Sequence, residues 1–327
     1  MTRFLKSEAG AVVLWVVATI LLAAALTPWL YGWGKDFAAH YADPGGLAGW
    51  LAGSCERARF SRYFNRAMLI AAVLLLFPLW WRVRLLSRAS GGVHSTNTWA
   101  GIGWKSGLIH AIIGFAAAAG LLWIMGVAVE IGGAFVPAEH DLSFKKFLLR
   151  AVVPAMGASI LEEWIFRALL IGLWLRIAGP WMACLGTSLV FAFVHFLEPP
   201  RGVEMADPRA WTAGFDLLGM VLRNYLNPQF IAAEFLTLFT VGMALAWARI
   251  RTGSLWLPIG MHAGWIFAFK SFNLFHKPAL ENGTGSLLVG GSLKVGLLPL
   301  ATLALTWLLL AWLLRWIPRG RFDAPRG

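Results

Sequence analysis

Residues 155–175 form an apolar stretch as long as a membrane helix, with three charged residues near its middle. The charges are Glu162, Glu163 and Arg167. A single charge at the centre of a membrane helix costs about 2.5–3.5 kcal/mol on insertion scales, so three together require other protein or a wet cavity around them. The stretch therefore predicts a helix enclosed by other helices, and its charges are the first candidates for function.

The spacing of the three charges separates their roles. On an α-helix Glu163 and Arg167 are four residues apart on one face, in register for an ion pair, whereas Glu162 is rotated away by about 100°. Arg167 is expected to neutralise Glu163 and to leave Glu162 available. The alternative is a structural Glu–Arg pair that stabilises a bundle, but such a pair needs only one glutamate.

Composition places the chain among polytopic all-α membrane proteins. Of its 327 residues 59% are hydrophobic and 13% are charged, about half the charged fraction of a soluble domain. The apolar residues fall in blocks long enough to cross a bilayer as helices. The net charge of +12 comes from basic residues at the ends of these blocks, which indicates topology signals and contacts with anionic lipid rather than nucleic acid. Two cysteines give no zinc-ligand spacing and no disulfide framework.

We expect eight membrane spans in one integral membrane domain over residues 1–327. The apolar blocks cover about residues 9–30, 66–81, 108–129, 155–175, 181–197, 230–247, 254–269 and 294–316. The first block is too long for a signal-peptide core, so an uncleaved first span is expected. Lys and Arg are equally frequent on the two sides, and the short turn with Arg249 and Arg251 and the basic tail favour both termini inside.

Two further segments carry local predictions. Pro154 should kink the charged helix or mark the point where regular helix begins. Residues 211–230 are expected to be interfacial or re-entrant, because Asp216, Arg223 and Asn224 interrupt their apolar runs.

Two histidines stand in separate apolar blocks, His195 near the end of one and His262 inside another. Two such histidines and an available glutamate supply a base, its partner and an oxyanion donor, which hydrolysis of an unactivated carbonyl requires. No nucleophile elbow and no Cys–His pair is present. Ser159 and Ser188 are expected to be small packing residues.

These residues match three motifs in order. Glu162 to Arg167 fits EExxxR, residues 191–195 fit FxxxH, and His262 stands in a third block. In this the chain resembles the CAAX protease and bacteriocin-processing family of intramembrane glutamic endopeptidases, which includes CAAX prenyl protease 2-like and abortive infection proteins. The resemblance covers about residues 145–275, the expected catalytic core.

The resemblance implies a role for each residue. Glu162 and His195 would activate water, His262 would stabilise the oxyanion, and Glu163 and Arg167 would set position and field. It implies a peptidase without cofactor or metal in the bacterial inner membrane, as a multi-pass protein. Its partners would be the lipid bilayer and a peptide or protein substrate at the membrane, with or without a lipid modification, and not nucleic acid.

The sequence departs from the family pattern after the third motif. Four residues after His262 the family has an Asn that is thought to share the oxyanion, and here Ile266 occupies that position. Losing one oxyanion donor typically costs about 2.7–4 kcal/mol of transition-state stabilisation. The oxyanion would then have to be stabilised by His262 alone, by a backbone N–H or by a relocated side chain such as Asn273.

Two other interpretations stay open. One is a metallopeptidase with Glu162, His195 and His262 as ligands, which no HExxH spacing supports and which sensitivity to chelators would reveal. The other is a non-catalytic scaffold, immunity factor or ion pathway built on the same charged core. Glu234 could belong to an ion route, or it could be an interfacial glutamate that snorkels to water.

Overall fold

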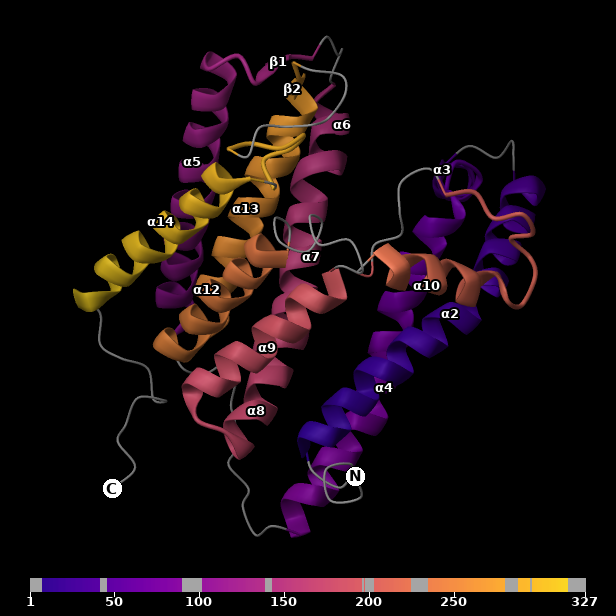
Figure 1. Ribbon diagram of the computed structural model, residues 1–327, viewed down its shortest axis with the longest axis horizontal. Coiled ribbons are helices and arrows are strands. Elements are labelled where there is room, and N and C mark those ends of the chain that lie inside the picture. The colour runs from indigo at the N-terminus through magenta and orange to yellow at the C-terminus, as the bar shows by residue number, and fades with distance from the viewer. Residues whose placement is uncertain are drawn as a thin grey trace. The chain divides into compact units, whose positions relative to one another are not determined.

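The chain folds into two compact, mainly helical units in a computed structural model (Figure 1). Unit 1 comprises residues 1–94 and 195–228, and unit 2 comprises residues 95–194 and 229–327. The prediction of an all-α membrane protein is confirmed. The structure describes residues 8–41, 46–89, 102–138, 143–195, 197, 203–224, 235–279, 288–294 and 296–316.

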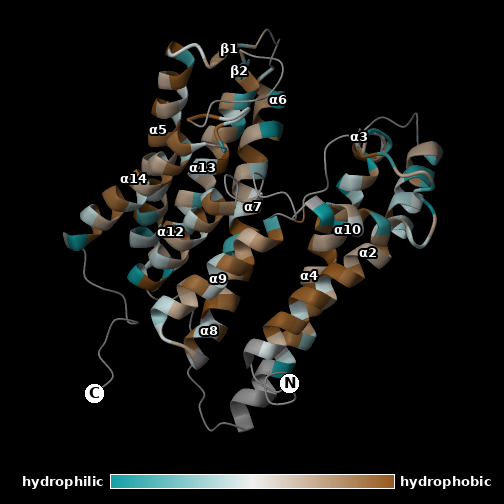
Figure 2. Cartoon of the chain, in the orientation of Figure 1, coloured by the Kyte–Doolittle hydropathy of each residue, from teal (hydrophilic) through white to brown (hydrophobic). Residues whose placement is uncertain are grey.

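Unit 1 is built on two long helices that pack along each other, α2 (Glu8–His40) and α4 (Phe60–Ala89). The shorter α3 (Gly46–Glu56) and α10 (Ala213–Asn224) pack against α2. Figure 2 shows a run of apolar residues along α4. The pattern suits helices whose middle parts face an apolar environment.

The helix α10 lies within the segment that was expected to be interfacial or re-entrant. It begins after the exposed Trp211, and its residues Leu217 and Val221 are buried in unit 1. A Cβ at Gly214 would collide with the carbonyl oxygen of Ala24 in α2, so glycine is needed for this close approach. The structure thus has a short amphipathic helix here, which suits the interfacial alternative. Residues 225–230 of the segment lie outside the described part of the chain.

Unit 2 contains the charged stretch and the helices that enclose it. Its core joins α5, α12, α13 and α14 through buried residues such as Leu122, Leu245 and Phe272. A short antiparallel ribbon of β1 and β2 pairs Phe135 with Pro278. The elements are α5 (Trp104–Ile131), β1 (Phe135–Pro137), α9 (Pro180–His195), α12 (Leu236–Thr252), α13 (Trp256–Phe275), β2 (His276–Pro278), α14 (Leu297–Leu313) and the 3-10 turn η4 (Leu314–Trp316), together with the charged helix.

The charged helix is a continuous helical path from Phe144 to Ile177 with two π-helical segments. It consists of α6 (Phe144–Phe147), the π-helical η1 (Leu148–Val152), α7 (Val153–Glu163), the π-helical η2 (Trp164–Leu170) and α8 (Ile171–Ile177). Pro154 stands in the first turn of α7, where its missing N–H is tolerated directly after η1. Pro154 therefore marks the start of a regular segment, as expected. The segment η2 begins directly after Glu163 and contains Arg167.

The helix that carries His262 is held against α5 by glycines. A Cβ at Gly260 would collide with the carbonyl oxygen of Ala111, and one at Gly264 would lie 2.6 Å from that of Phe115. Gly260 and Gly264 each stand two residues from His262, about 200° around the helix. The glycine face of α13 is therefore turned to α5, and His262 projects from the other side.

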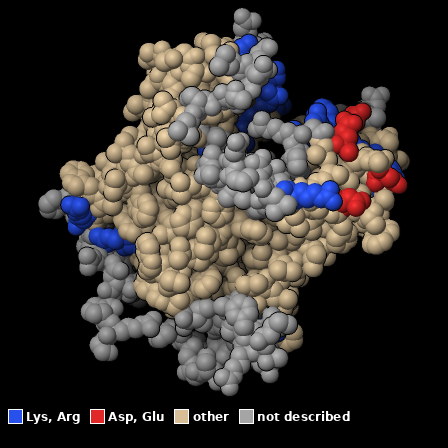
Figure 3. Space-filling model, viewed as in Figure 1, with Lys and Arg blue, Asp and Glu red and all other residues tan. Residues whose placement is uncertain are grey.

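Several helices present apolar surface outward, as membrane helices do. Among the described residues, three helices are long and apolar enough to cross a membrane: Gly10–His40, Phe60–Leu79 and Trp104–Ile131. The shorter apolar helices Pro180–His195 and Leu297–Leu313 accompany them. Figure 3 shows a largely uncharged face over unit 2, with Lys and Arg toward its edges. The expected count of eight spans remains a prediction.

Candidate active site

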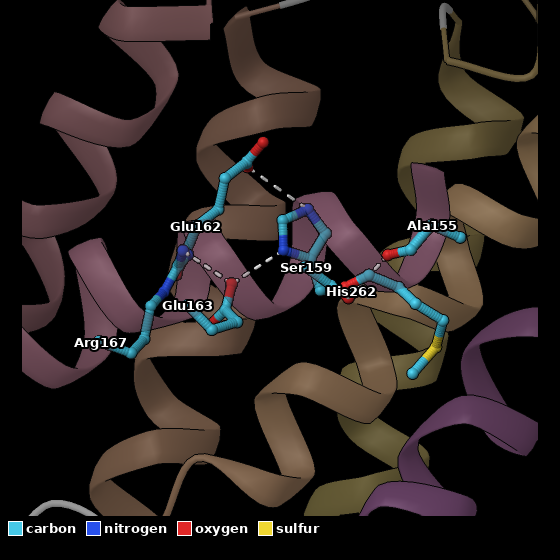
Figure 4. Close-up of polar contacts among 8 residues, drawn as sticks. Ala155, Ser159, Glu162, Glu163, Arg167 and His262 are labelled. Atoms are coloured by element: carbon cyan, nitrogen blue, oxygen red, sulfur yellow. Dashed lines mark hydrogen bonds and ion pairs between the residues drawn. The ribbon is translucent and has the colours of Figure 1, made fainter. Parts of the chain in front are cut away.

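Glu163 lies at the centre of the charged cluster (Figure 4). Its Oε1 accepts a hydrogen bond from Arg167 Nη1 at 3.0 Å and lies 2.8 Å from Nδ1 of His262. The side chains of Glu163 and Arg167 have no exposed surface. The expected ion pair between Glu163 and Arg167 is present. Glu163 also contacts His262 of α13, and no spacing within one helix could predict that contact.

Glu162 approaches the other nitrogen of the same imidazole. Its Oε2 lies 3.7 Å from Nε2 of His262, and 23% of its side chain is exposed. His262, with 6% of its side chain exposed, stands between two adjacent glutamates, one at each ring nitrogen. The structure thus brings together four residues from α7, η2 and α13, which form the cluster: Glu162, Glu163, Arg167 and His262.

Arg167 is enclosed on its remaining sides. Its Nη2 donates to the carbonyl oxygen of Gly242 in α12 at 3.3 Å. The ring of Phe191 lies 4.5 Å from the guanidinium carbon, and its centroid is 6.0 Å from that of His262. Phe191, the first residue of the FxxxH motif, therefore covers the ion pair, because a cation is attracted to an aromatic face.

The two serines near the cluster are satisfied within their own helices. Ser159 Oγ donates to the carbonyl oxygen of Ala155 at 2.7 Å, and Ser188 Oγ donates to that of Cys184 at 2.6 Å. Both side chains are fully buried. Their prediction as packing residues is confirmed, and neither is presented as a nucleophile.

His195 is the last residue of α9, one helical turn after Phe191, and it is half-buried. The boundary between the two units falls directly before it. Its convergence with Glu162 remains a prediction. Glu234, the candidate for an ion route, lies outside the described residues.

A comparison with family models finds a match over the segment that contains the cluster. Residues 144–268 match the family described as type II CAAX prenyl endopeptidase Rce1-like. The match covers less than half of the chain, and over this segment the chain is similar to the Rce1-like family. The match runs from the first residue of α6 into α13 and includes all four residues of the cluster. No curated protein and no solved structure matches the chain.

The match of this segment to the Rce1-like family supports a CAAX-type intramembrane protease that acts on a peptide or protein at the membrane. Together with the apolar helices it indicates a membrane protein. The family match covers the part of unit 2 that forms the cluster, whereas α2, α4, α5 and α14 lie outside it.

Ile266, four residues after His262, lies within the segment that matches the Rce1-like family. Ile266 is half-buried on α13, one turn after His262 and on the same side of the helix. Asn273 is eleven residues from His262, about 16 Å along the helix, and it is exposed. The suggestion that Asn273 replaces the missing donor is therefore wrong.

Arg249 is a residue of this site that the sequence analysis assigned elsewhere. The prediction counted it among the charges of a surface turn, but only 3% of the residue is exposed and its Nε donates to the carbonyl oxygen of Arg167 at 3.2 Å. Arg249 lies almost one turn inside α12, which ends at Thr252, whereas the expected span ended at residue 247. The turn between α12 and α13 therefore has one basic residue fewer than expected.

Proposed function

We propose that the cluster hydrolyses a peptide bond of a membrane-proximal substrate by means of a water molecule that Glu162 activates. The observation that carries this proposal is the contrast between two adjacent glutamates. Glu163 is fully buried and bound to both Arg167 and His262, whereas 23% of the Glu162 side chain is exposed. A general base must reach water, and Glu162 meets that condition.

The reaction follows from the acid–base chemistry of the carboxylate. Glu162 takes a proton from water as the water oxygen bonds to the carbonyl carbon of the substrate. His195 would orient this water with Glu162. The tetrahedral intermediate then breaks its C–N bond, and the protonated Glu162 returns the proton to the leaving amine. One water is consumed, and a carboxylic acid and an amine are formed.

His262 would stabilise the negative oxygen of that intermediate. Its Nδ1 lies 2.8 Å from Glu163, an acceptor when ionised, so the Nδ1 proton belongs to that bond. The nitrogen left to face the substrate is Nε2, which must also carry a proton to act as a donor. Glu163 would fix the ring in this orientation, and Arg167 would hold Glu163 in place.

The substrate class follows from the family rather than from the geometry. The family's description names a CAAX prenyl endopeptidase, so a peptide ending in a prenylated cysteine and three further residues is the first substrate to try. An apolar lipid group would suit a site reached between membrane helices. The same peptide without its lipid measures how much the lipid contributes.

The test is hydrolysis of these two peptides by the purified full chain, in water enriched in ¹⁸O. The proposal predicts one heavy oxygen in the new carboxyl group of each cleaved peptide. It also predicts loss of cleavage in Glu162→Gln and retention in Ser159→Ala, a buried control on the same helix. Cleavage by Glu162→Gln at the wild-type rate would sink the glutamate mechanism. Absence of cleavage by the wild type on both peptides would count against the CAAX substrate class.

A further inference from the structure

Two arginines join α12 to the charged helix in opposite directions. Arg167 in η2 donates from Nη2 to the carbonyl oxygen of Gly242 in α12. Arg249 in α12 donates from Nε to the carbonyl oxygen of Arg167 itself. The first contact uses the side chain of Arg167 and the second uses its backbone, so this residue is held at both ends.

The backbone contact has a cause in the π-helical geometry of η2. In an α-helix the carbonyl oxygen of Arg167 would accept the N–H of Ile171, four residues later. Here the N–H of Ile171 donates instead to the carbonyl oxygen of Phe166, five residues earlier. The Arg167 carbonyl thus loses its α-helical donor, and a buried carbonyl without a partner is costly. The guanidinium of Arg249 supplies a donor at this position.

We propose that Arg249 is a positioning residue, which stabilises the π-helical turn η2 and thereby aims Glu163 and Arg167 at His262. The turn begins at the residue after Glu163, so a change in its hydrogen-bond register would rotate Arg167 relative to the glutamate. The expected effect of Arg249 on turnover rests on the proposed hydrolysis, whereas its expected effect on the geometry of the cluster does not.

The chain offers a matched control two residues away. Arg251 stands on the same helix and donates from Nη2 to the carbonyl oxygen of Leu314, after α14. Arg249→Met and Arg251→Met each remove one arginine-to-carbonyl contact between α12 and a neighbouring element. Only the first of these contacts involves the charged helix.

The primary readout is the state of the His262 ring, which a merely structural role would leave unchanged. Solid-state ¹⁵N NMR of histidine-labelled protein in bilayers reports the ring nitrogens, and the His262→Gln variant identifies the signals of His262. We expect these signals to shift in Arg249→Met and to stay at the wild-type position in Arg251→Met. With a cleavable peptide, kcat of Arg249→Met should fall at least tenfold while KM changes less than twofold.

Arg249→Lys and Arg249→Gln keep the test decisive if the methionine variant does not fold. Lysine restores a cationic donor, so its His262 signals should lie closer to those of the wild type than the glutamine variant's do. The proposal is overturned if folded Arg249→Met or Arg249→Gln has wild-type His262 signals, or if Arg251→Met shifts them equally. Because the NMR readout needs no substrate, failure of the hydrolysis proposal would not be mistaken for failure of this one.

Discussion

At the scale of single residues, the imidazole of His262 organises the site. It receives Glu163 at one nitrogen and approaches Glu162 at the other, so two neighbours in the sequence acquire different environments. Glu163 is sealed among protein atoms, whereas Glu162 is partly exposed. The same side-chain chemistry can therefore serve as an anchor in one position and as a base in the next.

The first prediction concerns the residue one turn after His262. Ile266→Asn should raise turnover at least tenfold, because the amide adds a donor on the same side of α13 as His262, the proposed oxyanion donor. One such donor is typically worth about 10²–10³ in rate. Cleavage assays of the purified variant measure this, with Ile266→Leu as a control of similar size and no donor. An unchanged rate in a stably folded Ile266→Asn would mean that another group already fills the role.

The second prediction concerns the buried ion pair. Arg167→Met should lower the free energy of unfolding by about 3–5 kcal/mol, because it leaves Glu163 charged among protein atoms without its arginine. Thermal unfolding in detergent measures the loss, and Arg223→Met, which removes an exposed arginine from α10, should be nearly neutral. If the two variants melt alike, the pair does not stabilise the fold.

At the scale of elements, the site depends on how α7, η2 and α13 are held. Ser143 caps the start of the charged helix by accepting the N–H of Lys146, and the glycine face of α13 lets it approach α5 closely. The π-helical η2 lies between Glu163 and the remainder of that helix. Departures from regular α-helix of this kind are frequent at functional sites.

The third prediction concerns the close approach of α13 to α5. Gly264→Ala should destabilise the protein by about 1–3 kcal/mol and lower activity, because the new Cβ would lie 2.6 Å from the Phe115 carbonyl oxygen and force α13 outward. Gly157→Ala is the matched control, since its Cβ meets nothing within 4 Å and alanine favours a helix. Melting and cleavage measurements on both variants test this prediction. Equal stability of the two variants would contradict the close approach of α13 to α5 at Gly264.

At the scale of the whole molecule, composition and periodicity were sufficient for the fold class. Long apolar blocks around buried charges allow little besides a helical membrane protein. Spacing along one helix also gave the pairing of Glu163 with Arg167. The motifs drew attention to His262, which lies 99 residues from Glu163 in the chain.

Contacts between helices could not be derived in this way. Three features depend on the depth at which one helix meets another: the burial of Arg249, the bond between Glu163 and His262, and the π-helical register of η2. A hydrophobic pattern indicates which face is buried but not which residue lies opposite. Arg249 was misassigned for this reason, because a basic residue near the end of a span is usually a surface charge.

The most direct test compares Glu162→Gln with Glu163→Gln in the whole chain, purified under the same conditions, by cleavage rate and by melting temperature. We predict that Glu162→Gln loses at least 100-fold in rate with an unchanged melting temperature, because it removes only the base. Glu163→Gln should lower the melting temperature as well as the rate, because it leaves the buried Arg167 without its counter-charge. Wild-type cleavage by folded Glu162→Gln, or the reverse pattern between the two variants, would contradict the assignment of base and anchor.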